Sequence, residues 1–356
     1  MDHSGANTGW HGRGAASNPA NRFEMLHLEP DPDLGPAEEA APTTRFLRDA
    51  TATIINYNDS PDLGFDASIN PYRGCEHGCI YCYARPFHEY LGFSAGLDFE
   101  TRIMVKTDAP ALLRKELASP KWKPQVIALS GVTDCYQPVE RRLRLTRGCL
   151  EVLAEFRNPV GIVTKNHLVT RDLDVLRELA RHRAVVVFIS LTTLDAELAG
   201  RMEPRTSRPE HRLAAMRALA AAGVPVGVMT APVIPGLTDH ELPALLRAAA
   251  EAGAQHAGYV VLRLPHGVKD LFEQWLRRHF PDRADKVLNR LRSVRSGKLN
   301  DPRFGTRMRG EGPWAEQIQQ MFRVSCRRTG LNQQRLELST ASFRVPGRAE
   351  QLELLG

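Results

Sequence analysis

Residues 73–85 read RGCEHGCIYCYAR and carry the most informative pattern of the chain. Three of its six cysteines, Cys75, Cys79 and Cys82, lie in this stretch with the spacing C-x3-C-x2-C. Three thiolates this close together can hold three corners of a metal centre. Structural zinc normally takes four protein ligands, whereas an iron–sulfur cluster held by three cysteines leaves one iron open to a further molecule.

Three interpretations of this pattern compete. One is a zinc site that His77, His88 or Cys135 completes. The second is a group of cysteines that are merely buried in a core, and the third is a cluster with an open corner. The spacing favours the two metal sites over buried cysteines.

The composition excludes several classes of protein. The chain has 356 residues, enough for one large domain or two ordinary ones. Hydrophobic residues make up 42% and charged residues 25%, which excludes a wholly disordered chain, a collagen-like repeat and a small disulfide scaffold. The sequence has no apolar run of about 18 residues and no signal-peptide pattern. We therefore expect no membrane span and a cytoplasmic location, where cysteines stay reduced.

Apolar segments of strand length alternate with helical patterns after a polar start. Residues 1–45 are rich in Gly, Ala, Asn, Pro and acidic residues, which predicts a disordered extension, with order beginning near Asp66. Strands are predicted at 67–72, 125–130, 160–164, 184–191, 225–230 and 257–264, and helices at 108–118, 145–156, 171–180, 210–222 and 238–252. Strands that are apolar throughout are typical of a parallel sheet covered by helices. Periodicity leaves a barrel, part of a barrel and an open doubly wound sheet as alternatives.

These patterns divide the chain into a β/α core at 46–264 and a basic helical C-terminal extension at 265–356. Between Arg283 and Arg309, nine Lys and Arg oppose only Asp285 and Asp301, a net charge of +7, while the whole chain has +6. Such a segment predicts contact with the phosphates of a nucleic acid. The alternative is a solvated helix face whose charges are paired elsewhere.

The cysteine spacing, with an aromatic residue just before the third cysteine, resembles the signature of the radical S-adenosylmethionine (radical SAM) superfamily. Three segments are similar to its spore photoproduct lyase-like members, which are associated with DNA repair. They are PYRGCEHGCIYCYAR at 71–85, GVTDCYQP at 131–138 and EPRTSRPEHRL at 203–213. The resemblance implies an α/β fold, a partial (β/α)6 TIM-like barrel with a helical C-terminal extension.

The resemblance also implies the cofactors. The cysteines of the motif would hold a 4Fe–4S cluster, and S-adenosylmethionine (SAM) would bind its fourth iron. Reductive cleavage of SAM would then give a 5′-deoxyadenosyl radical, with electrons from a donor such as flavodoxin or ferredoxin. These cofactors carry the chemistry, and the protein positions them and excludes water.

Further site residues follow from the resemblance. Tyr81 takes the aromatic place that contacts adenine, although it could equally pack the loop against the barrel. The candidates for the SAM ribose and carboxylate are Lys165, Ser190, Glu203 and Arg205. The alternatives are a surface salt bridge between Glu203 and Arg205, and ordinary strand-end capping by Ser190.

Cys135 is the candidate hydrogen-atom donor. In spore photoproduct lyase-like enzymes a protein thiol returns a hydrogen atom to the product radical, and it precedes a T-x-D-like turn. The corresponding place here is close to Gly131, whereas Cys135 follows Asp134. This departure leaves a small buried cysteine as the alternative.

The implied function is that of a radical SAM enzyme acting on a nucleic-acid lesion or a modified nucleotide. One alternative is radical modification of a peptide or small metabolite. Another is a non-catalytic protein that binds zinc or nucleic acid.

Overall fold

A computed structural model describes residues 10–24 and 42–347. Its main sheet consists of β2 (Ile55–Tyr57), β3 (Ala67–Ile69), β6 (Ile127–Leu129), β7 (Val160–Thr164), β8 (Val185–Ser190), β9 (Val226–Val233) and β10 (His256–Val261). The strand order is β10-β9-β8-β7-β6-β3-β2. All neighbours are parallel except β2, which is antiparallel to β3. The six parallel strands are those predicted from the apolar runs.

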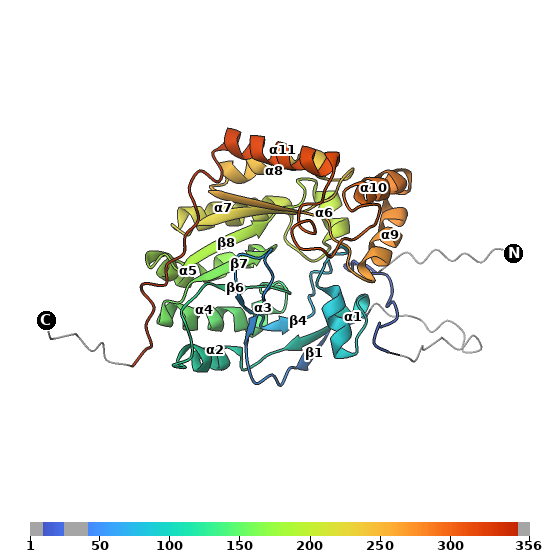
Figure 1. The fold of residues 1–356 in the computed structure, drawn as a ribbon. Coiled ribbons are helices and arrows are strands. Elements are labelled where there is room, and N and C mark those ends of the chain that lie inside the picture. The colour runs from blue at the N-terminus through green and yellow to red at the C-terminus, as the bar shows by residue number, and fades with distance from the viewer. Residues whose placement is uncertain (1–9, 25–41, 348–356) are drawn as a thin grey trace.

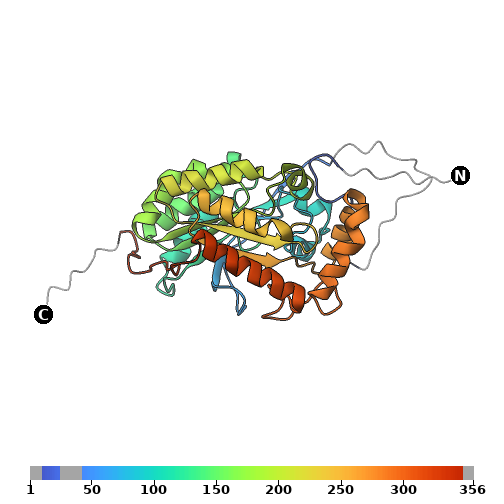
Figure 2. The ribbon, with the colours of Figure 1, turned by 90° about the horizontal axis from the view of Figure 1, so that it is seen from above.

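Helices connect the parallel strands and lie outside the curved sheet (Figures 1 and 2). The longer ones are α2 (Ala109–Leu117), α4 (Leu145–Phe156), α5 (Leu173–Arg181), α7 (Pro209–Ala221) and α8 (Leu242–Glu251). Shorter segments are α3 (Glu140–Leu143), η2 (His167–Asp172), α6 (Ala196–Met202) and η3 (Asp239–Glu241). The predicted partial barrel is confirmed, because the strand order runs from β10 to β2 without joining these two edges.

A small second sheet lies beside the cysteine motif and was not predicted. It consists of β1 (Arg45–Arg48), β4 (Tyr72–Arg73) and β5 (Arg102–Val105), with β5 in the centre. Next to it are η1 (Arg85–Leu91) and α1 (Leu97–Thr101). Order therefore begins well before Asp66.

Residues 10–24 also differ from the predicted disordered extension. Ala15 and Asn21 are buried against the elements that follow the cysteine motif. Asn21 donates to the carbonyls of Glu89 and Phe93, 3.0 Å away in each case. Polar side chains of this segment thus form hydrogen bonds to the core. Composition alone does not show whether a polar side chain bonds to the protein or to water. The remaining residues of 1–41 lie outside the described ones.

The C-terminal part contains three helices, α9 (Val268–His279), α10 (Pro281–Ser293) and α11 (Pro313–Thr329). Helix α11 packs on α8 (Figure 1), and the Phe322 and Tyr259 rings lie 4.6 Å apart. The basic segment therefore forms a helix and a folded loop on the core. In the described part of the chain, we find no helix with the length and apolar character that a membrane crossing needs.

Candidate functional site

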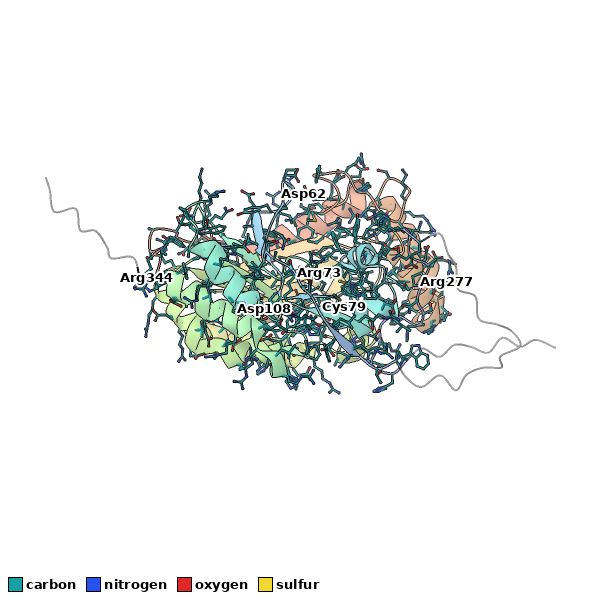
Figure 3. The ribbon with its side chains drawn as sticks, turned by 90° about the horizontal axis from the view of Figure 1, so that it is seen from below. Asp62, Arg73, Cys79, Asp108, Arg277 and Arg344 are labelled. Atoms are coloured by element: carbon teal, nitrogen blue, oxygen red, sulfur yellow. The ribbon has the colours of Figure 1, made fainter. Side chains whose placement is uncertain are left out.

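The cysteine loop, residues 75–82, follows β4 and is held by its backbone. The amide of Cys75 donates to the carbonyl of Phe99 at 2.9 Å, and the amide of Ile80 donates to the carbonyl of Met202 at 3.0 Å. Figure 3 shows Cys79 near the middle of the molecule in the view from below. The loop thus joins the small sheet to the end of α6.

A buried ion pair between Arg85 and Glu100 supports the backbone of this loop. Both side chains are fully buried, and their closest atoms lie 2.5 Å apart. Arg85 also donates to the carbonyl of Cys79 at 3.0 Å. Glu100 accepts hydrogen bonds from the amides of Gly14 at 3.0 Å and Ala15 at 2.9 Å. The N-terminal segment 10–24 is therefore part of the support of the loop.

The three thiols of the loop fit an iron–sulfur cluster. Cys75 and Cys79 are buried and Cys82 is half-buried, and none is in a disulfide. Burial raises the pKa of all three thiols, and for Cys75 and Cys79 nearby carboxylates or other thiols raise it further. Closely placed soft sulfur ligands suit iron–sulfur clusters, and a bound metal makes up for the cost of the buried thiolates. The donor set and its rigid backbone therefore suit the group that the motif predicts.

The residues considered above as a fourth zinc ligand lie in other surroundings. No three His, Cys, Asp or Glu side chains converge on one ion in residues 10–24 and 42–347. The His77 ring lies between Asp134, at 3.3 Å, and Asn166, at 3.2 Å. His88 packs against two phenylalanine rings, and Cys135 lies in the main core. The residues proposed to complete a zinc site thus have other partners.

Glu203 is the centre of a second buried group next to the cysteine loop. Its carboxylate accepts hydrogen bonds from the Tyr81 hydroxyl and, at 2.9 Å, from the Thr192 hydroxyl. It also forms a fully buried ion pair with Arg212. Burial raises the pKa of Glu203, and Arg212 opposes this effect. The position of the Tyr81 ring beside the loop is therefore set by a buried carboxylate.

Most of the predicted SAM-binding residues lie around this group. The Lys165 ammonium lies 5.9 Å from the centre of the Tyr81 ring. Ser190 ends β8, and its carbonyl accepts a hydrogen bond from Arg212 at 3.1 Å. Tyr81, Lys165, Ser190 and Glu203 are thus brought together at the carboxyl ends of the parallel strands, where β/α barrels place their active sites.

Arg205 lies apart from them, and the alternative of a surface salt bridge between Glu203 and Arg205 is not what the structure has, because Glu203 pairs with Arg212. The Arg205 guanidinium lies 3.2 Å from Glu76, which is part of the cysteine loop. Arg212 takes the place beside Glu203 because α7 directs it inward to the end of β8. A signal for this existed in the sequence. Arg212 stands at helical spacing with the buried Ala215, Met216 and Leu219, so it lies on the apolar face of α7.

Asp134 orders the ends of β6 and β7. It accepts hydrogen bonds from the Thr164 hydroxyl and the Lys165 amide, both at 2.8 Å, and lies beside His77. Burial acts to raise the pKa of Asp134, but His77 and these donors outweigh it and lower the pKa to about 2. The carboxylate thus links the cysteine loop to the loop that carries Lys165.

Cys135 is fully buried in the main hydrophobic core. Its carbonyl accepts a hydrogen bond from the Thr146 hydroxyl of α4 at 2.6 Å, and burial raises the pKa of its thiol. This environment matches the alternative of a small core cysteine.

Several cations of the basic segment are used inside the fold. Arg295 is fully buried and donates to the carbonyls of Val261 and Leu262 at 2.8 and 2.9 Å. Arg307 pairs with Asp62 at 2.5 Å. Arg303 is paired as well, with Asp301 and Glu311. The net charge of this segment therefore overstates the number of cations that are available to a partner.

Comparison with known proteins finds a matching family model and several relatives. A family model described as the Radical SAM superfamily matches residues 69–249. An uncharacterized protein of Mycobacterium tuberculosis is 43% identical over 222 residues, which are 62% of this chain and 65% of that protein. An uncharacterized protein of Methanocaldococcus jannaschii is 30% identical over 173 residues, 49% of this chain and 62% of that protein. The chain thus covers less than two thirds of the length of these relatives.

A solved structure has the same fold. It is spore photoproduct lyase complexed with dinucleoside spore photoproduct, with a TM-score of 0.57 and 18% sequence identity. The match covers 80% of each chain, so the similarity includes most of the barrel and its surroundings.

Proposed function

Since this chain belongs to the radical SAM superfamily, we propose that it holds a 4Fe–4S cluster on Cys75, Cys79 and Cys82 and cleaves SAM reductively. When bound, the cluster and SAM supply a 5′-deoxyadenosyl radical that takes a hydrogen atom from the substrate. The observation that carries the proposal is the loop with its three thiols. The buried pair of Arg85 and Glu100 holds this loop directly beside the group around Glu203.

The protein residues bind and orient SAM. Lys165 makes no ion pair with a described carboxylate, so its ammonium is available for the SAM carboxylate. Tyr81 offers its ring to the adenine. Glu203 accepts hydrogen bonds from Tyr81 and Thr192 and pairs with Arg212, so it positions the Tyr81 ring beside the proposed SAM site.

Anaerobic reconstitution with iron and sulfide tests this function. We expect about four iron and four sulfide per chain, a reduced-cluster EPR signal that changes when SAM is added, and 5′-deoxyadenosine in the presence of dithionite. Cys79→Ala should lose the product and the SAM-dependent change of the signal. The matched control is Cys326→Ala, which removes a buried thiol of α11 far from the loop and should keep all three. A protein that takes up one zinc and yields no 5′-deoxyadenosine would contradict the proposal.

The substrate that we propose is a nucleic-acid lesion or a modified nucleotide. Support comes from the shared fold with spore photoproduct lyase, whose structure holds a dinucleoside photoproduct. The test compares 5′-deoxyadenosine formation with and without damaged oligonucleotides. Stimulation by peptides or small metabolites alone would favour the other enzyme class instead.

We also propose a class of electron donor and a cellular compartment. Reductive cleavage needs one electron at low potential, which a donor such as flavodoxin or ferredoxin would deliver. All six cysteines are free thiols, which suits the reducing cytoplasm.

A further inference from the structure

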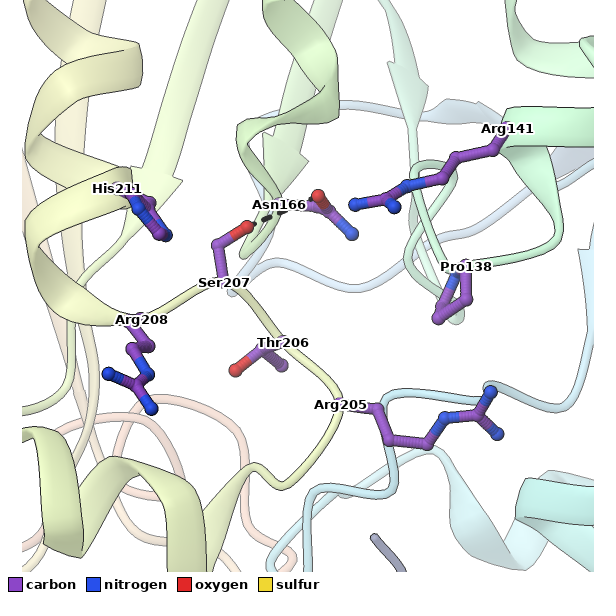
Figure 4. A pocket seen from close by; sticks show the side chains of 8 residues that line it. All are labelled: Pro138, Arg141, Asn166, Arg205, Thr206, Ser207, Arg208 and His211. Carbon is purple, nitrogen blue, oxygen red and sulfur yellow. Dashed lines mark hydrogen bonds between the residues drawn. The ribbon is translucent and has the colours of Figure 1, made fainter.

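We infer that a pocket at the rim of the barrel, between α3 and the start of α7, binds backbone phosphates of a nucleic acid. The pocket, which we call the rim pocket, has a volume of about 460 Å³. Its lining includes three arginines, Arg141, Arg205 and Arg208, and the ring of His211 (Figure 4). The inference rests on the nucleic-acid substrate of the proposed function, and it names the surface that would hold this substrate.

Two of the three arginines of the rim pocket have no carboxylate partner among the described residues, and the third is paired with Glu76. No carboxylate is part of its lining. Arg141 and Arg208 are exposed, and neither makes an ion pair within residues 10–24 and 42–347. Arg205 forms an ion pair with Glu76, which is not part of the lining. Two unpaired guanidinium groups that line one cavity favour a bound anion, and a guanidinium group binds phosphate through paired, charge-assisted hydrogen bonds.

The floor of the pocket is rigid and polar. The hydroxyl of Ser207 donates to the Asn166 side chain at 3.2 Å and accepts from the amide of His167 at 2.8 Å. The Asn166 amide in turn lies 3.2 Å from the His77 ring, which belongs to the cysteine loop. A phosphate in the pocket would thus be held at a fixed distance from the proposed cluster. Helix α7, with its positive end at Pro209, adds to the attraction for an anion.

The arrangement suits a chain of phosphates better than a single one. Arg142 lies within α3 and Arg144 follows its end, and neither forms an ion pair within the described residues. Arg142 and Arg144 thus add positive charge to the short segment that carries Arg141. The basic segment between Arg283 and Arg309 is a weaker candidate, because Arg295, Arg303 and Arg307 are already engaged within the fold.

Binding of a short fluorescent single-stranded oligonucleotide, measured by anisotropy at several salt concentrations, tests the inference. The variant Arg141→Gln/Arg208→Gln removes two charges from the rim pocket. The matched control Arg283→Gln/Lys286→Gln removes two exposed charges from α10, where neither residue forms an ion pair within the described part of the chain. Circular dichroism and the melting temperature of each variant confirm that it is folded.

We expect the pocket variant to lower the salt dependence by roughly 1.4 in the slope of log K against log salt, about 0.7 for each lost phosphate contact. Near ~0.1 M salt this corresponds to about a twentyfold loss of affinity, while the control should lose little. Equal losses in both variants, or a loss in the control alone, would overturn the inference. Protection of the pocket by inorganic phosphate without any binding of the oligonucleotide would also overturn it, in favour of a small phosphorylated ligand.

The inference and the proposed function fail separately. Formation of 5′-deoxyadenosine by wild-type protein that binds no oligonucleotide would remove the rim pocket as a nucleic-acid site and leave SAM cleavage standing. Pocket-dependent binding by a protein that never forms 5′-deoxyadenosine would do the reverse.

Discussion

At the scale of single residues, the buried charges explain how the site is built. Arg212 is fully buried, and it donates to the carbonyls of Ser190 and Ser207 as well as to Glu203. One side chain thus connects the end of β8, the loop before α7 and the carboxylate that holds Tyr81. A buried charge that loses its partner is costly, because no water replaces the lost interactions.

This argument predicts the effect of Arg212→Met. The variant leaves the buried Glu203 carboxylate without its ion-pair partner and removes a donor from two carbonyls, so we expect the free energy of unfolding to fall by about 3–5 kcal/mol. SAM affinity should fall as well, because the Tyr81 ring loses its support. Urea denaturation measures the first effect, and calorimetric titration of the reconstituted protein measures the second.

The control for this prediction is Arg201→Met. Arg201 pairs with Glu197 on the exposed surface of α6, and such pairs contribute about 0–1 kcal/mol. If both variants destabilise the protein to the same small extent, the pair of Arg212 and Glu203 does not organise the site.

The sequence predicts the site only in part, for reasons that concern single residues. The three cysteines lie within eight positions, so their proximity follows from the covalent chain. In contrast, the pairing of Glu203 with Arg212 depends on the path of the chain between α6 and α7. Glu203 and Arg205 are close in sequence, which is compatible with an ion pair between them. In the structure the buried partner of Glu203 is Arg212, which is farther along the chain.

At the scale of elements, local patterns identify the barrel strands but not the small sheet. Each barrel strand is a run of apolar residues, and β7 has the predicted bounds, residues 160–164. In contrast, β1 has four exposed positions and pairs with β5, which lies more than fifty residues away. Such a pairing leaves no local signal, because it depends on where the cysteine loop brings the chain.

One contact between distant elements predicts a dependence on pH. Asp62, in the loop between β2 and β3, accepts hydrogen bonds from the Gly305 amide at 2.7 Å and from Arg307 at 2.5 Å. The Gly305 amide is the main cause that lowers the pKa of Asp62, and Arg307 lowers it further. A carboxylate with a lowered pKa stabilises the fold fully above the unfolded value of about 3.9, and this stabilisation is lost as the pH falls through the folded value.

We therefore expect Asp62→Asn to lower the melting temperature at pH 7, with a difference from the wild type that shrinks as the pH falls below about 4. Calorimetric melting curves at a series of pH values measure this difference. The control Asp285→Asn removes an exposed partner of Arg277 and should differ little from the wild type throughout. A difference that stays constant from pH 7 to acid would show that the loss comes from packing and not from the charge of Asp62.

At the scale of the whole molecule, the C-terminal part is connected to the barrel by hydrogen bonds and by packing. Arg295 donates to the carbonyls of Val261 and Leu262 at the end of β10, and the amide of Val261 donates to the carbonyl of Met308 at 2.9 Å. The segment that contains Met308 thus lies against the edge strand β10. Helix α11 covers α8 and the Tyr259 ring from outside.

The last prediction is that a fragment ending at Leu264 does not fold on its own. Its truncation leaves the apolar side of α8 and the Tyr259 ring in water, and it leaves the edge of β10 open to pairing with other chains. We expect the full chain to unfold in one calorimetric transition, and the fragment of residues 1–264 to bind a hydrophobic dye, aggregate and take up no iron. A fragment that melts cooperatively and assembles a cluster would show instead that the barrel and the extension at 265–356 are separate domains.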